Sequence, residues 1–125
     1  MTLADVVRLL EAEVLVAPAD ESIKVAAGGA ADLISDVLAF VAKKNTLLIT
    51  GLTNPQVVTT ADLLDLTGII FVRGKKPGQD VLKMAQQRGL PLLRTHLHMY
   101  EACGILYKAG LRSSRADQDD DNDFD

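Results

Sequence analysis

Residues 46–55 read TLLITGLTNP, and this stretch decides the fold. Residues 46–50 carry no charge and are largely aliphatic, as is typical of a short strand buried on both faces. Gly51 ends the strand, and Pro55 is favoured as a first helical residue, with Asn54 before it as the N-cap. The stretch therefore predicts a strand that leads through a short turn into a helix, the repeating unit of a parallel sheet.

The same alternation continues on both sides of this unit. Apolar runs predict further strands at residues 14–17, 23–27, 69–72 and 91–94, with the second of these ending at Gly28 and Gly29. Helical spacing predicts helices over residues 2–12, 32–44, 55–66, 78–88 and 99–109, with Thr2 and Asp32 as N-caps and Gly89 as a C-cap. We therefore expect an α/β fold of three layers, a largely parallel sheet of four to five strands with helices on both faces.

Composition and charge set the domain boundary. Of the 125 residues, 48% are hydrophobic and 4% aromatic, which is enough aliphatic material to fill one core. Periodicity is lost after residue 112, and residues 117–125 hold six Asp, so we expect a domain over 1–112 and a disordered acidic tail over 113–125. Without those six charges the net charge of -4 becomes +2, and this nearly neutral body does not favour nucleic-acid binding.

Other function classes are excluded by what the sequence lacks. Cys103 is the only cysteine, so no internal disulfide can form. No apolar run is long enough for a membrane span, and the first residues do not resemble a signal peptide. The sequence thus predicts a cytoplasmic protein without a membrane association.

Candidate ligand-binding residues follow four of the expected strands. Ligands of parallel sheets bind beyond the carboxyl ends of the strands, where glycines admit close approach and arginines can bind phosphate or carboxylate. The candidates are Gly28, Gly29, Thr50, Gly51, Thr53, Asn54, Arg73, Gly74, Arg94 and Thr95. Short loops also need Gly, Thr and Asn for turns and caps, so a structural role explains most of these residues equally well.

Catalytic and metal signatures are incomplete. Gly68 and Gly74 enclose five residues where a P-loop has four, and Lys75 is followed by Lys76 where a P-loop has Ser or Thr. His96, His98 and Cys103 do not complete a tetrahedral metal site, and Cys103 falls on the apolar stripe of a helix. We therefore expect no catalytic residue, no metal and no cofactor.

Several segments together resemble a known family. Residues 28–38, GGAADLISDVL, are similar to the G-x-x-S-D-L-L-S-D-V segment of stand-alone DRTGG-domain proteins, and residues 48–55, LITGLTNP, resemble the strand and turn that follow. Residues 69–74, 85–95 and 100–110 continue the resemblance in the same order, over about 3–111 in total. The Asp-Arg-Thr-Gly-Gly motif that names the family is absent. The turn after the third expected strand reads Leu52-Thr53-Asn54, without Asp-Arg, and the turn after the fourth reads Arg73-Gly74-Lys75, without Thr-Gly-Gly.

The resemblance implies a regulatory role. DRTGG domains stand beside nucleotide-sensing CBS domains in regulated pyrophosphatases and often lie at homodimer interfaces. They are also related to the non-catalytic N-terminal domain of HPr kinase/phosphorylase, and stand-alone members accompany iron-only hydrogenase components. The leading hypothesis is a non-catalytic regulatory or scaffolding module that homodimerises or docks on a partner, such as a hydrogenase or other redox enzyme component. The alternatives are a sensor of a nucleotide or anion at the strand-end loops and an HPr-kinase-like serine kinase, which the missing P-loop disfavours.

Overall fold

The central sheet of the computed structural model has the strand order β1-β5-β4-β3-β2. The structure describes residues 1–20, 22–41 and 43–115. Strands β2 to β5 run parallel, and β1 joins the edge of β5 antiparallel. The strand bounds are β1 Glu13–Val16, β2 Ala27–Ala30, β3 Thr46–Thr50, β4 Gly68–Phe71 and β5 Leu92–Arg94. The expected largely parallel sheet is thus confirmed.

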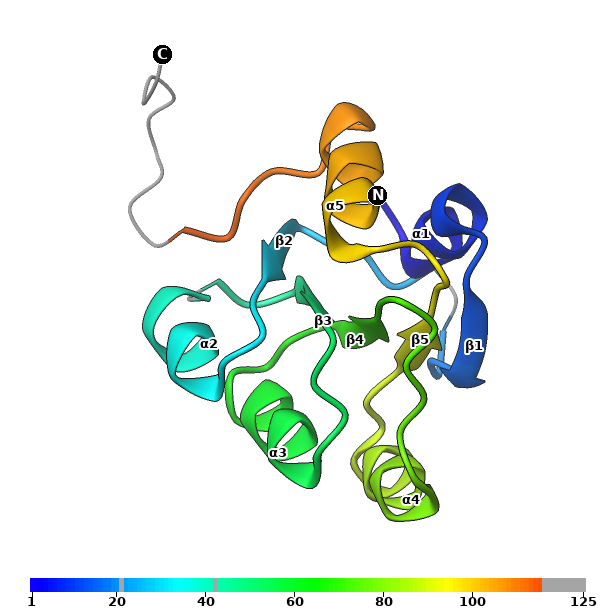
Figure 1. Ribbon diagram of the computed structural model, residues 1–125, viewed down its shortest axis with the longest axis vertical. Helices are drawn as coiled ribbons and strands as arrows, with labels where there is room; N and C mark the ends of the chain where they lie inside the picture. Colours follow the sequence, from blue (N-terminus) through cyan, green and yellow to red (C-terminus); the bar gives the residue numbers. More distant parts are fainter. Residues whose placement is uncertain (21, 42, 116–125) are drawn as a thin grey trace.

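Helices cover both faces of this sheet and make three layers (Figure 1). One face is covered by α1 and α5, and the other by α2, α3 and α4. The helix bounds are α1 Leu3–Leu10, α2 Ile34–Phe40, α3 Pro55–Leu63, α4 Gln79–Arg88 and α5 Met99–Lys108. The expected layering is therefore also confirmed.

Alternation along the strands divides the core in two. Leu47 and Ile49 of β3 pack towards α1 and α5, whereas Leu48 packs towards the other three helices. In β4, Ile69 and Phe71 face those three helices and Ile70 faces the opposite way. Each such side chain is almost fully buried, which contributes about 1.5–3 kcal/mol. The uncharged strands are therefore explained by helices on both sides.

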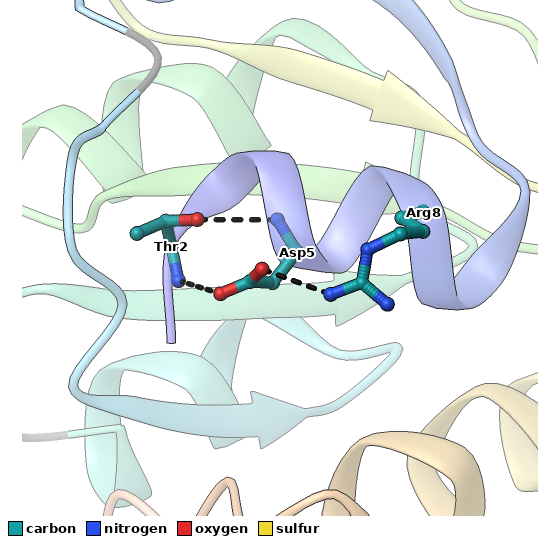
Figure 2. A network of polar contacts seen from close by, with 3 residues as sticks. All are labelled: Thr2, Asp5 and Arg8. Carbon is teal, nitrogen blue, oxygen red and sulfur yellow. Dashed lines mark hydrogen bonds and ion pairs between the residues drawn. The ribbon is translucent and has the colours of Figure 1, made fainter.

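The predicted helix caps are largely confirmed. The Thr2 hydroxyl accepts a hydrogen bond from the Asp5 amide, and the Asp5 carboxylate accepts one from the Thr2 amide and pairs with Arg8 (Figure 2). The Asn54 side chain caps α3 in the same way, through the Val57 amide at 3.1 Å. Gly89 ends α4 in the left-handed conformation, with φ 67°.

The expected strand over residues 23–27 is wrong. The strand lies at Ala27–Ala30, so Gly28 and Gly29 are inside β2 and do not follow it. Residues 23–25 pair instead with the start of the chain, because the Val25 amide donates to the Met1 carbonyl and the Leu3 amide donates to the Ile23 carbonyl. Residues 23–25 are therefore not part of the central sheet.

Further boundaries differ from expectation, and α2 runs over Ile34–Phe40 and not over residues 32–44. Asp32 does not cap α2, whose N-cap is Leu33 without a side-chain hydrogen bond, and α3 ends at Leu63 and not at residue 66. The folded part also continues past residue 112, since Ser113 forms a bridge with Gly28 and Ser114 is buried. Residues 116–125, the rest of the expected acidic tail, lie outside the described residues.

Candidate functional site

The carboxyl ends of β3, β4 and β5 form the strand-end edge where ligand binding was expected. At β3 the local polar groups bind one another. The Asp32 carboxylate accepts hydrogen bonds from the Gly51 amide at 2.7 Å and from the Thr50 hydroxyl at 3.2 Å. This explains why Asp32 does not cap α2, and it leaves the Gly51 amide and the Thr50 hydroxyl already engaged by an internal carboxylate.

The Arg73 side chain lies over Gly51. Arg73 follows β4 in the left-handed conformation, with φ 58°, which costs a non-glycine residue about 1–3 kcal/mol. Its Nη2 atom is 2.6 Å from the position that a Cβ on residue 51 would occupy. Among the described residues the guanidinium has no hydrogen bond or ion pair. A Cβ at position 51 would push the guanidinium aside, so Gly51 leaves room for this unpaired, exposed cation beside the end of β3.

A second glycine contact lies beside the first. Gly74 also has a positive φ, 68°, and the His96 Nδ1 atom is 2.8 Å from the position of its missing Cβ. The other ring nitrogen of His96 is 3.4 Å from Nη2 of Arg94, whose Nη1 lies 3.5 Å from a Glu13 carboxylate oxygen. The Nε atom of Arg94 is buried without a hydrogen-bond partner. Gly74 in the turn after β4 thus lies against His96, and His96 lies beside Arg94 at the end of β5.

Two of the remaining loop candidates, Thr95 and Asn54, have structural roles. The buried Thr95 hydroxyl donates to the Leu10 carbonyl at 2.8 Å and ties the end of β5 to α1. Asn54 caps α3, and Thr53 lies half-buried in the same turn. Of the ten predicted residues, the structure therefore brings Thr50, Gly51, Arg73, Gly74 and Arg94 into one polar strip along the strand ends.

Gly28 and Gly29 belong to a different place. They line a hollow of about 380 Å³ between the edge strand β2 and helix α5. Tyr100 and Tyr107 of α5 also line the hollow and are 89% and 65% exposed, with Gly104 between them on the helix. The sequence analysis missed these three residues. Their signal was a glycine in the middle of an amphipathic helix, with a tyrosine one turn away on each side.

Exposed apolar side chains gather around this strand. Among the described residues seven large hydrophobic side chains are exposed, and five of them belong to α5 or to α2 and its N-cap: Leu33, Leu38, Phe40, Tyr100 and Tyr107. Phe40 lines a second hollow of about 270 Å³ on the α2 side of β2. Helices α5 and α2 lie on opposite layers at this end of the sheet (Figure 1). We call β2, α2 and α5 together the β2 end.

Four hollows of the described surface lie away from the polar strip. Their volumes are about 270–400 Å³, and none of these four is lined by Gly51, Arg73 or Gly74. A ligand of the polar strip would therefore lie on the surface and outside these four hollows.

Other site chemistry has little support in the described residues. Partial burial raises the pKa of the Cys103 thiol, which disfavours the reactive thiolate. Within residues 1–20, 22–41 and 43–115, no group of three His, Cys, Asp or Glu side chains could hold a metal ion. Nor does this part of the chain contain a helix long and apolar enough to cross a membrane.

Comparisons with known proteins agree with this architecture. The fold is similar to that of a solved structure of the CBS and DRTGG domains of the regulatory region of Clostridium perfringens pyrophosphatase, complexed with its activator diadenosine tetraphosphate. The TM-score is 0.71 at 14% sequence identity, and the match covers 90% of this chain and 48% of that one. The chain thus spans about half the length of that structure. No curated protein matches the sequence.

The fold is that of a three-layer α/β domain with a mostly parallel sheet. The family model of the DRTGG domain matches residues 5–109, and the chain belongs to this family. The resemblance noticed in the sequence is confirmed, although the motif that names the family is absent here.

Proposed function

We propose that this chain is a non-catalytic regulatory module that binds a second copy of itself through the β2 end. The observation that carries the proposal is the stripe Tyr100, Gly104 and Tyr107 on the exposed side of α5. Two largely exposed tyrosines flank a position without a side chain, next to an apolar hollow. Tyrosines are enriched where proteins meet, because they bury a large apolar area and keep a polar group.

Gly104 is unexplained by the fold of one chain. A Cβ at this position would have no atom within 4 Å, so nothing in the monomer requires glycine. Glycine inside a helix costs about 1 kcal/mol relative to alanine. A helix of a second copy could approach closely at a glycine, and burial of the two tyrosines in that contact would offset this cost.

The comparisons support a regulatory role. The pyrophosphatase structure is named as a regulatory region bound to an activator, and its DRTGG domain shares this fold. The alternative occupant of the β2 end is a partner protein, such as a hydrogenase or other redox enzyme component. Serine kinase activity stays outside the proposal, because the sequence has no P-loop to hold a nucleotide for phosphoryl transfer.

A second candidate function is sensing of a small ligand at the strand-end strip. The specific observation that favours it is the exposed Arg73 guanidinium, which lies over Gly51 without a hydrogen bond or ion pair to the described residues. The activator bound by the pyrophosphatase region is consistent with a domain of this fold serving ligand-controlled regulation.

Self-association can be tested with one substitution on α5. Gly104→Arg places a long charged side chain in the stripe, and the open space around residue 104 leaves the fold intact. We expect the unmodified chain to sediment as a dimer at micromolar concentration and Gly104→Arg as a monomer with unchanged circular dichroism. Gln87→Arg, at an exposed position of α4, adds the same charge elsewhere and should remain dimeric.

Two outcomes would contradict the proposal. A chain that is monomeric throughout the micromolar range does not self-associate. If neither Gly104→Arg nor Gln87→Arg disrupts the dimer, the dimer forms through another surface. If the chain is monomeric, binding of a purified hydrogenase component that Gly104→Arg abolishes would assign the β2 end to the partner protein.

A further inference from the structure

We propose that the turn after β4 binds a small oligophosphate, either as the phosphate chain of a nucleotide or as an inorganic anion. This inference rests on the second candidate function, ligand sensing, and is independent of self-association. The turn contains three cations in four residues, Arg73, Lys75 and Lys76. All three are exposed, and none forms an ion pair with the described residues.

The backbone of this turn is fixed. The Arg73 amide donates to the Leu97 carbonyl at 2.8 Å, the Gly74 amide to the Thr95 carbonyl at 2.9 Å, and the Lys75 amide to the Val72 carbonyl at 3.1 Å. Two of these three consecutive amides thus bond to the loop after β5, and the third closes the turn on Val72, directly after β4. The cations consequently project from a rigid support, which lowers the conformational entropy that a bound anion would have to remove.

The position of the Arg73 guanidinium depends on two features of the backbone. The left-handed backbone of Arg73 and the missing side chain of Gly51 together place Nη2 above the end of β3. An arginine in this position can present its fork of N–H donors to phosphate oxygens. A charge on a disordered loop would need neither the glycine nor the positive φ.

Neighbouring charges favour an anion with several negative groups. His96 packs on Gly74 in the turn, and Arg94 lies beside His96. Two carboxylates lie along the same strip, but Asp32 already accepts two hydrogen bonds and Glu13 pairs with Arg94. Asp80, in the first turn of α4, is the next acidic group along the chain. A single carboxylate ligand would engage one of the cations, whereas a chain of phosphates can bridge them.

The test uses tripolyphosphate as the probe, with the full chain and calorimetric titration at low and moderate salt. We expect Lys75→Gln/Lys76→Gln to weaken binding at least tenfold. The control is Lys43→Gln/Lys44→Gln, which removes the same charge from two exposed lysines just before the amino end of β3. This double variant should change binding less than twofold. Equal weakening by both double variants would show diffuse attraction to net charge and overturn the proposal.

Gly51→Ala tests the built geometry without removing a charge. The added methyl would meet Nη2 of Arg73, the far end of a flexible side chain, so the guanidinium must move while the fold is retained. We expect Gly51→Ala to weaken tripolyphosphate binding about as much as Arg73→Gln. If Gly51→Ala binds like the unmodified chain, the position of Arg73 has no role and the proposal fails.

The two sources of the phosphate chain are distinguished by comparing tripolyphosphate, ATP and adenosine. If ATP binds more tightly than tripolyphosphate and the same substitutions weaken both, the ligand is a nucleotide. If ATP and tripolyphosphate bind equally, the ligand is the anion alone. Stronger binding of a single-stranded oligonucleotide at equal phosphate concentration would overturn the proposal. If tripolyphosphate does not bind but another metabolite raises the melting temperature, the ligand class is wrong while ligand sensing stands.

Discussion

At the β1 end of the sheet, α1 begins in a capping box and buries Leu3, Val6 and Leu10 almost completely. At the β2 end, α2 has seven residues and no side-chain cap, and the edge strand has glycine at two of its four positions. The β1 end also carries a buried hydrogen bond from Thr95 to Leu10, whereas the β2 end leaves five large apolar side chains exposed.

This difference separates stability from recognition. The β1 end buries most of its apolar residues within one chain, with Val14 as the exposed exception, so most of its contribution to the free energy of folding is already realised in the monomer. The β2 end retains apolar surface that the described residues leave exposed and that a second molecule could bury. The four predictions below test that contrast, from the largest expected effect to the smallest.

The largest effect is expected for a core residue of the β1 end. Leu10→Ala should lower the free energy of unfolding by about 2–5 kcal/mol, because a fully buried leucine is replaced and a cavity remains. Leu38→Ala at the β2 end removes a side chain that is 52% exposed and should cost under about 0.5 kcal/mol. Urea denaturation of the monomer measures both. Equal losses would mean that the two ends do not differ in packing.

A smaller effect is expected for the glycine strand itself. Gly29→Ala would bring a methyl within 2.9 Å of the Ser114 hydroxyl and 3.0 Å of Val41, and should destabilise the fold by about 1–3 kcal/mol. Gly104→Ala meets no atom within 4 Å and should stabilise the monomer by about 1 kcal/mol. Thermal unfolding at a concentration where light scattering shows monomer gives both values. The comparison fails if both substitutions change stability in the same direction.

The cap of α1 should contribute about 1 kcal/mol. Thr2→Ala removes the hydroxyl that accepts the Asp5 amide, which typically costs about 1 kcal/mol at an N-cap. Ser35→Ala near the start of the uncapped α2 should change stability by less than about 0.5 kcal/mol, since that hydroxyl makes no cap hydrogen bond. Chemical denaturation of both variants provides the measurement, and a loss at Ser35 as large as that at Thr2 would contradict the assignment.

The smallest effect is a pH dependence at the β1 end. The Thr2 amide, and then Arg8, hold the pKa of Asp5 below its ordinary value in the folded chain. A lowered folded pKa means that the stabilisation is present above the unfolded pKa of about 3.9 and is lost as pH falls below it. The difference in melting temperature between the unmodified chain and Asp5→Asn should therefore shrink from pH 7 towards about pH 3. If the difference in melting temperature stays constant over this pH range, it does not come from the ionisation of Asp5.

Local sequence patterns predicted the centre of the fold well. The uncharged strands β3 and β4, the Asn54 cap and the Gly89 stop depend on neighbours within a few residues, and all are found near their expected places. The position of β2 could not be predicted in this way. Gly28 and Gly29 are extended beside Leu111, Val41 and Ser114, which are distant in the sequence and leave little room for a side chain.

The candidate site was predicted only in part, for a similar reason. Arg73 and Gly51 were expected near the strand ends, but their dependence on each other follows from the register of β3 and β4. Asp32 had an equally good local role as a helix cap, and only the sheet brings the Gly51 amide within its reach. The exposure of Tyr100 and Tyr107 depends on which parts of α5 other elements leave uncovered, which helical periodicity alone does not determine.

The short segment after α5 has a consequence for the solubility of the domain. The Gly28 amide donates to the Arg112 carbonyl at 2.8 Å, and the Gly28 carbonyl accepts from the Ser114 amide at 3.1 Å. These bonds occupy the outward-facing polar groups of Gly28 in a strand that has no other partner on that side among residues 1–20, 22–41 and 43–115. An open edge of this kind is a template for strand addition from other chains and for aggregation. Residues 112–114 thus cover the edge of β2 at Gly28 and disfavour edge-to-edge pairing there. The helix surfaces on either side remain accessible.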